Sequence, residues 1–173
     1  MDGDITLQQR YEAVGRRIET ACRAAGRPPD QVTLLAVSKT FPAGRVLDLA
    51  GCGQRRFGEN YLQEALAKIS ECAIQRPDWR LEWHFIGPIQ SNKTRPIAEH
   101  FDWVHSVDRE RVARRLAEQR PPHLAPLQVC IQVNIDGGPT KAGVAPEDAL
   151  ALAQAVVALP NVRLRGIMTI PEP

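Results

Sequence analysis

The stretch that decides the fold is Val32-Thr33-Leu34-Leu35-Ala36-Val37-Ser38-Lys39-Thr40, followed at once by Phe41-Pro42. A short apolar run bounded by turn residues predicts a strand buried on both faces, as in a parallel sheet. Lys39 would then lie at the carboxyl end of a buried strand, where α/β proteins gather their ligand sites. Partial withdrawal from water favours the free amine of a lysine, which is a nucleophile towards carbonyls. From this strand alone, the more probable interpretation of Lys39 is a lysine at a strand end whose side chain reaches solvent.

Outward from this strand, the chain repeats a unit of short strand, polar loop and helix. Connections long enough for a helix require parallel strands with right-handed crossovers. The further strands are expected at 56–60, 81–87, 103–107, 129–135 and 162–170, and the helices at 7–25, 42–49, 61–69, 96–100, 109–116 (with Asp108 as N-cap) and 146–158.

Two architectures fit six such units: an open doubly wound sheet and a β/α barrel. No Gly-x-Gly-x-x-Gly motif follows a strand, so the usual dinucleotide fingerprint is missing. A complete barrel has eight strands and typically ~250 residues, so six units would form an incomplete one.

Length and composition indicate one domain, residues 1–173, with an ordinary globular share of apolar residues. The net charge of +2 is too small to favour nucleic acid or an acidic membrane surface as partner. No apolar stretch approaches ~20 residues, and residues 1–4 do not begin a secretory signal, so we expect a cytoplasmic protein without a membrane span. The cysteines and histidines show no metal-ligand spacing, so no metal is expected and the thiols should be reduced and buried.

Several motifs together resemble one family, the pyridoxal phosphate homeostasis proteins, whose fold is similar to the N-terminal barrel of alanine racemase. The resemblance covers the chain from about Ile5 to Pro173, and all the motifs in this order make it specific. The motifs are Leu35-Ala36-Val37-Ser38-Lys39-Thr40, Phe57-Gly58-Glu59-Asn60-Tyr61, Trp83 to Lys93, His105-Ser106-Val107-Asp108, Gln132-Val133-Asn134-Ile135, Lys141-Ala142-Gly143 and Arg165-Gly166-Ile167-Met168.

The resemblance implies a β/α barrel of the TIM type that binds pyridoxal 5'-phosphate (PLP) in vitamin B6 homeostasis, with Lys39 as the Schiff-base lysine. An aldehyde cofactor needs an unprotonated amine, so the chemistry agrees with the position of Lys39. The resemblance also places Asn60 near the ring hydroxyl, Met168 against the ring and His84 near the pocket. Each has a structural alternative: an amide that caps the next helix, a core methionine and a hydrogen-bonded core histidine.

Two departures from related proteins bear on function. A similar racemase stretch carries lysine and arginine where this chain has Asn134 and Lys141, and racemases add a catalytic tyrosine from a second domain. Racemisation needs acid and base groups on both faces of the substrate α-carbon. We therefore expect a PLP carrier without catalysis, with PLP-dependent apo-enzymes as recipients, over the alternatives of a racemase-like enzyme or a degenerate fragment that binds no cofactor.

The second departure concerns the binding of the cofactor's phosphate group. The family continues with two more strands, whose loops supply a phosphate cradle and an arginine near the pyridine nitrogen. Backbone N–H groups and charge-assisted contacts typically contribute several kcal/mol to phosphate binding. We therefore expect this chain to bind PLP more weakly than its longer relatives and to discriminate little between pyridoxal with and without phosphate. We also expect marginal stability, or pairing of its open edge with another chain.

Overall fold

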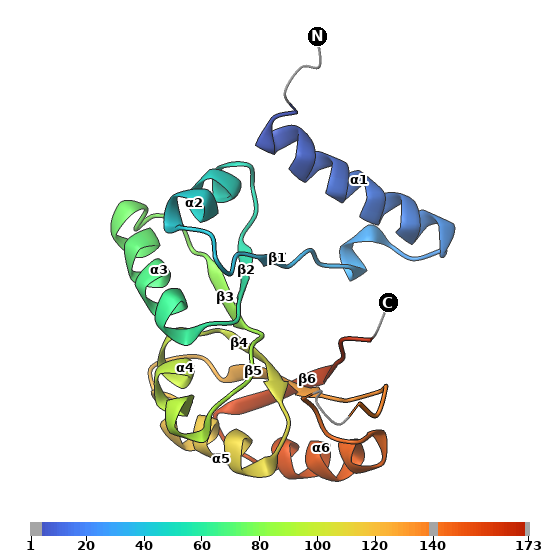
Figure 1. The fold of residues 1–173 in the computed structure, drawn as a ribbon, viewed down its shortest axis with the longest axis vertical. Coiled ribbons are helices and arrows are strands. Elements are labelled where there is room, and N and C mark those ends of the chain that lie inside the picture. Colours follow the sequence, from blue (N-terminus) through green and yellow to red (C-terminus); the bar gives the residue numbers. More distant parts are fainter. Residues whose placement is uncertain (1–4, 139–141, 172–173) are drawn as a thin grey trace.

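The computed structural model describes residues 5–138 and 142–171, in which helices and strands alternate along the chain (Figure 1). Lys141 lies outside the described residues. The helices are α1 (Leu7–Ala24), α2 (Ala43–Gly51), α3 (Leu62–Gln75), α4 (Thr94–His100), α5 (Glu110–Gln119) and α6 (Ala149–Val157), with short 3₁₀ helices η1 (Pro29–Gln31), η2 (Ser91–Lys93) and η3 (Pro146–Asp148). The strands are β1 (Ala36–Val37), β2 (Arg56–Glu59), β3 (Glu82–Phe85), β4 (Trp103–Val107), β5 (Leu127–Gln132) and β6 (Val162–Met168).

The strand order identifies the architecture. The six strands form one parallel sheet in the order β1-β2-β3-β4-β5-β6, so each strand pairs with the next one along the chain. A doubly wound sheet reverses its strand order at a switch point, whereas a β/α barrel does not. Figure 1 shows the sheet curving, with α2 to α6 along its outer side. The predicted incomplete barrel of six β/α units is confirmed.

Element positions follow the predicted pattern closely, and most differences are at the ends. α1 begins with a capping box between Thr6 and Gln9 and ends before Gly26, whose φ of 63° suits a residue without Cβ. Asp108 is not the N-cap of α5. That position belongs to Arg109, whose guanidinium pairs with the Asp108 carboxylate at 2.7 Å. Asp108 was predicted as the cap because Asp is a favoured N-cap residue, but its carboxylate is paired with the guanidinium of Arg109 instead.

The core lies between the outer face of the sheet and the helices. Residues that alternate along the strands point outward into it, and the rings of Phe57 and Trp83 lie 5.7 Å apart. Phe85 meets Phe101 edge-on at 5.2 Å. All four cysteines are free thiols, and three of them are buried as predicted, whereas Cys52 is partly exposed.

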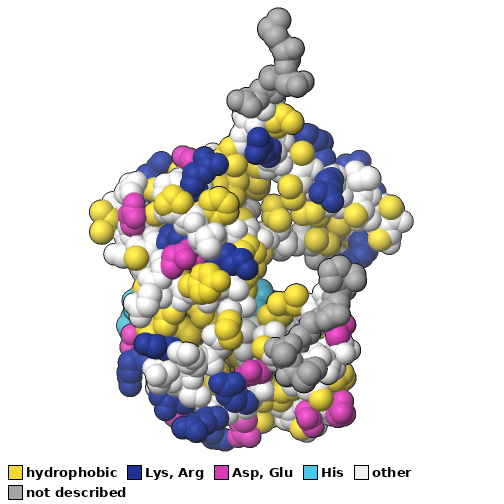
Figure 2. All heavy atoms as spheres, viewed as in Figure 1, with side chains coloured by type: hydrophobic (Ala, Val, Ile, Leu, Met, Phe, Trp, Pro, Cys, Tyr) yellow, Lys and Arg dark blue, Asp and Glu magenta, His cyan; other side chains and the backbone are white. Residues whose placement is uncertain are grey.

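The sheet is exposed at its two edge strands, β1 and β6, and this overturns one prediction. β1 has two residues, Val37 is 48% exposed and Ile167 on β6 is 68% exposed. The expectation of a strand buried on both faces is therefore wrong for β1. The reason is that β1 lies at the open end of a sheet that does not close: within the described part of the chain it pairs with β2 alone, and no opposing strand covers the inner side of Val37. Figure 2 shows hydrophobic atoms at the surface on both sides of the opening between α1 and β6.

No helix within residues 5–138 and 142–171 is both long and apolar enough to span a lipid bilayer.

A buried leucine on α5 tests the position of the core. Leu116 is fully buried between α5 and the sheet, whereas Leu150 on α6 is 69% exposed. Leu116→Ala should lower the free energy of unfolding by about 2–5 kcal/mol, because it leaves a cavity, while the control Leu150→Ala should change it by less than about 1 kcal/mol. Urea unfolding followed by circular dichroism measures both. Equal effects of the two variants on the free energy of unfolding would contradict this position of the core.

Candidate functional site

The carboxyl ends of the strands enclose a pocket of about 250 Å³, which we call the strand-end pocket. It draws residues from the ends of four strands, β2, β3, β5 and β6, as expected for loops that leave parallel strands on one rim. The side chains that line it are Asn60, Ile86, Pro88, Gln132, Val133, Asn134, Ala142 and Ile170.

Asn60 follows β2 and is held by tight backbone packing. A Cβ on Gly87 would lie 2.2 Å from the carbonyl oxygen of Asn60, so only glycine permits this approach of the two loops. The N–H of Ile86 donates to the carbonyl of Glu59 at 2.9 Å and fixes the same junction. The side chain of Asn60 does not cap α3, whose N-cap is Tyr61. Its buried Oδ1 has no hydrogen-bond partner in the described structure.

Asn134 reaches the same pocket from the loop after β5. Its Nδ2 donates to the carbonyl of Gly138 at 2.9 Å, which sets the direction of the amide. Its backbone N–H donates to Val144 at 2.8 Å, and Gly143, at φ 120°, packs so closely that a Cβ would lie 2.7 Å from the Asn134 nitrogen. The Oδ1 of Asn134 is also buried without a partner among the described residues.

Two buried amide oxygens without partners give the pocket its chemistry. An unmade hydrogen bond of this kind costs about 1–3 kcal/mol, which a ligand with correctly placed donors recovers. The described lining combines amides with apolar side chains and includes no Asp, Glu, Lys, Arg or His. The pocket therefore suits a small, partly apolar ligand that is oriented by hydrogen bonds.

Lys39 lies on the neighbouring strand end. Val37 pairs with Gly58, two residues before Asn60, so Lys39 and Asn60 follow their strands at the same level. Lys39 does not line the strand-end pocket, and its side chain is exposed. The expectation that it is withdrawn from water is wrong in this structure, because the inner side of the edge strand β1 is uncovered. The alternative interpretation is the one that fits: Lys39 lies at a strand end and its side chain reaches solvent.

A buried ionic network holds the turn that carries Lys39. We call it the Lys68 network; it joins Ser38, Thr40, Glu59, Glu64 and Lys68. The Lys68 ammonium, on α3, donates to Glu59 at 2.6 Å, to the Ser38 carbonyl at 2.7 Å and to Glu64 at 2.9 Å. The Ser38 hydroxyl donates to Glu59, and the Thr40 N–H donates to Glu64, both at 2.6 Å. The backbone on each side of Lys39 is therefore bonded to the same cluster.

The charges in this network differ in their exposure. The side chains of Lys68 and Glu59 are 2% and 0% exposed, and Glu64 is 34% exposed. The hydrogen bond from Lys68 lowers the pKa of the Glu64 carboxyl below its ordinary value of 4.5, with a further contribution from the Thr40 N–H. A lowered carboxyl pKa stabilises the fold above the unfolded value, and that contribution is lost as the pH falls through the folded pKa. The Glu64 bonds are thus intact at neutral pH.

The other two predicted contacts lie at different depths. Met168 ends β6, pairs with the pocket residue Gln132 and is half-buried, so it lies at the level of the rim. His84 pairs with Gly58 and so lies one pleat below Asn60. It is not part of the pocket lining. The contacts of Lys39, Asn60, His84 and Met168 with a cofactor stay predictions.

His84 belongs instead to a histidine pair on the inner face of the sheet. Its Nε2 lies 2.9 Å from the Glu82 carboxylate, and its Nδ1 lies 2.9 Å from Nε2 of His105. When both rings are neutral, Nε2 of His84 donates to the carboxylate and Nδ1 accepts from the N–H of His105. Burial lowers the pKa of His84 and lowers that of His105 to about 4.

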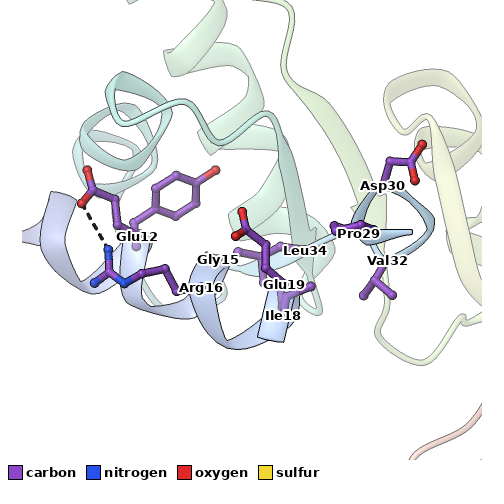
Figure 3. A pocket seen from close by; sticks show the side chains of 10 residues that line it. Glu12, Gly15, Arg16, Ile18, Glu19, Pro29, Asp30, Val32 and Leu34 are labelled. Carbon is purple, nitrogen blue, oxygen red and sulfur yellow. Dashed lines mark ion pairs between the residues drawn. The ribbon is translucent and has the colours of Figure 1, made fainter. Parts of the chain in front are cut away.

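A second cavity, of about 540 Å³, lies between α1 and the segment before β1 (Figure 3). The Glu12 carboxylate and the Arg16 guanidinium in this cavity form an ion pair at 3.7 Å, drawn as a dashed line in Figure 3. The charged groups of the second cavity are therefore partly paired. The buried polar atoms without partners lie elsewhere. No group of three His, Cys, Asp or Glu side chains within the described residues is placed to hold a metal ion. The strand-end pocket is therefore the better candidate site.

The fold and this rim define a protein of the alanine racemase N-terminal barrel class. Residues 10–172 match the family model described as alanine racemase, N-terminal domain. The chain is 61% identical over 168 residues to the pyridoxal phosphate homeostasis protein of Pseudomonas aeruginosa, covering 97% of this chain and 71% of that protein. It is 51% identical over 160 residues to the protein of the same name from Escherichia coli, covering 91% and 67%.

Solved structures show the same fold. PipY of Synechococcus elongatus, with PLP bound, superposes with a TM-score of 0.71 at 37% identity, covering 89% of this chain and 70% of that one. An alanine racemase of Clostridium difficile shares the fold alone, with a TM-score of 0.61 at 15% identity, covering 90% and 39%. This chain belongs to the pyridoxal phosphate homeostasis protein family.

The close approach of Gly87 to Asn60 can be tested by adding one methyl group at residue 87. Gly87→Ala should lower the free energy of unfolding by about 2–4 kcal/mol, because backbone atoms must move to admit the Cβ. Gly44→Ala is the matched control: nothing lies within 4 Å of its added Cβ, and alanine favours the helix by about 0.5–1 kcal/mol. Urea unfolding compares the two, and a neutral Gly87→Ala would contradict this packing.

The histidine pair predicts a pH dependence of stability. Because the folded pKa of His105 is lowered, the unfolded chain binds the proton first, so stability is full above pH 6.5 and falls as the pH drops below it. Between pH 6.5 and 5 the loss attributable to His105 should be at most about 2 kcal/mol. His105→Gln should flatten this decline, and a control at the exposed His123, His123→Gln, should leave it in place. Urea midpoints at pH 7.5, 6 and 5 provide the measurement; identical slopes in all three proteins would rule the pair out as the cause.

Proposed function

We propose that this chain binds PLP reversibly at the carboxyl rim of its sheet, with Lys39 as the residue that bonds covalently to the cofactor. The observation that carries the proposal is the coincidence, on one rim, of an exposed primary amine and a pocket with two unpartnered amide oxygens. The family membership supports it, as does the relative PipY, which has been solved with PLP bound.

The described residues have the chemistry that the aldehyde and the ring of this cofactor require. PLP supplies an aldehyde, an aromatic ring with a phenolic hydroxyl, a pyridine nitrogen and a phosphate. Asn60 and Asn134 offer acceptors for a ring hydroxyl or a protonated ring nitrogen, and Met168 and Ile86 offer apolar surface. Neighbouring strands lie about 4.8 Å apart, a spacing that the flexible lysine stem can cross from β1 to the space above Asn60.

The covalent step needs no further reactant. Deprotonated Nζ of Lys39 forms a C=N bond to the aldehyde carbon, and the aldehyde oxygen leaves as water with the two amine hydrogens. Nothing is oxidised or reduced, so water reverses the bond and releases the cofactor. A reversible bond on an accessible lysine suits a protein that holds PLP and passes it to apo-enzymes in vitamin B6 homeostasis.

A carrier role fits this rim better than racemisation. Racemisation needs an acid and a base on opposite faces of the α-carbon. The described lining of the strand-end pocket offers the amides Asn60, Gln132 and Asn134, which do not exchange protons near neutral pH. The likeness to alanine racemase is at the level of the fold.

Borohydride reduction and peptide mass mapping test the proposal. With limiting PLP, the chain should give one reduced pyridoxyl adduct, on Lys39, because the rim holds the ring beside that amine. Lys39→Ala should lose this adduct. Lys93→Ala, at an exposed lysine after β3, is the matched control and should keep it.

Adducts spread over several lysines, or an adduct unchanged in Lys39→Ala, would contradict the proposal. Turnover of D- or L-alanine by the purified chain would favour the racemase-like alternative instead.

A further inference from the structure

We propose that Glu59, Glu64 and Lys68 are positioning residues for Lys39: they hold the turn of residues 38–41 so that the lysine faces the cofactor. None of the three touches the strand-end pocket, so they would act through the backbone of the turn. This inference rests on the proposed function of Lys39 and names the residues that hold this lysine in position.

The turn itself needs support. It is closed by the Phe41 N–H donating to the Ser38 carbonyl at 3.1 Å, with Lys39 and Thr40 at its centre. Thr40 has φ 67°, a left-handed conformation that β-branched residues rarely adopt and that costs on the order of a tenfold shift in its population or more. Such a conformation persists only where the surroundings impose it, and functional sites are where it is commonly found.

The Lys68 network supplies that support on both sides of Lys39. Before Lys39, the Ser38 carbonyl accepts from the Lys68 ammonium and the Ser38 hydroxyl donates to Glu59. After Lys39, the Thr40 N–H donates to Glu64, which Lys68 also contacts. The lysine between them has an exposed side chain, so the backbone is ordered while the amine stays accessible.

The same network connects Lys39 to Asn60. Glu59 is the last residue of β2 and precedes Asn60 directly, and its Oε1 is bonded to both Ser38 and Lys68. The ends of β1 and β2 are thereby joined by one buried cation from α3. Moving Lys68 would alter the position of the reactive amine relative to the amide that faces the pocket.

The central variant is Glu64→Ala. Glu64 is 34% exposed, so its removal should leave the fold intact while freeing the Thr40 N–H. Losing one charge-assisted hydrogen bond should slow the formation of imine absorbance with PLP about five- to tenfold at pH 7.5. Glu64→Gln keeps an acceptor oxygen and should recover most of the rate. Glu71→Ala is the matched control, an exposed glutamate on the same helix that bonds only to Gln75 in the described structure.

Hydrogen exchange of the Thr40 amide provides a second readout that needs no cofactor. The amide should exchange at least tenfold faster in Glu64→Ala than in the wild type or in Glu71→Ala. Equal exchange rates, or imine formation at the wild-type rate in Glu64→Ala, would overturn the positioning role. If the wild type forms no imine on Lys39 but Thr40 exchange responds as expected, the proposed function fails while the ordering of the turn stands.

Lys68 can be examined without leaving a lone buried charge. Lys68→Met alone strands the Glu59 carboxylate in the core, so the informative variant is Lys68→Met combined with Glu59→Gln. The pair should remain folded by urea unfolding and should form imine about tenfold more slowly than the wild type. A wild-type rate in this folded double variant would also overturn the inference.

Discussion

The bond between the Lys68 ammonium and the Glu59 carboxylate, at 2.6 Å and nearly free of solvent, is the interaction on which the candidate site depends. Removing one partner of a buried ion pair typically costs about 3–5 kcal/mol, because the other charge is left without compensation. The pair lies at the junction of β1, β2 and α3. Apolar side chains in its place could not form hydrogen bonds with the carbonyl and the hydroxyl of Ser38. The buried cation therefore bonds both to the core and to the turn that carries the exposed Lys39.

The architecture was predictable because the chain repeats its signals. Short apolar runs bounded by Gly, Pro and polar residues gave the strands, and the long connections required them to be parallel. Trp103–Val107 was predicted to the residue, and α2 begins at Ala43, one residue after the expected start at Pro42. Local patterns do not contain the strand order, so the choice between a doubly wound sheet and a barrel came from the family resemblance and was then confirmed by the sequential pairing of β1 to β6.

The environment of the site residues was harder to predict. The apolar run before Lys39 suggested burial, but β1 lies at the open end of an unclosed sheet, where no opposing strand of the described structure covers its inner side, so Val37 and Lys39 are exposed. The sequence analysis did not single out Lys68, and only its bonds to Ser38 and Glu59 in the structure show that it is buried at the strand ends. A signal was present in hindsight: Glu64 and Lys68 are four residues apart on one helix face, directly after the Glu59-Asn60 strand end. The resemblance placed His84 near the cofactor pocket, which stays a prediction, and the structure shows its ring bonded to Glu82 and His105 one pleat below Asn60.

The central claim is that one rim presents Lys39, Asn60 and Asn134 to the same PLP molecule. A crystal structure of the chain grown with PLP tests it most directly. We expect continuous electron density from Nζ of Lys39 to the aldehyde carbon, with the ring over the strand-end pocket and the amide oxygens of Asn60 and Asn134 within hydrogen-bond distance of its polar atoms. PLP bonded to another lysine, or lying away from the rim while both amides remain without partners, would contradict it.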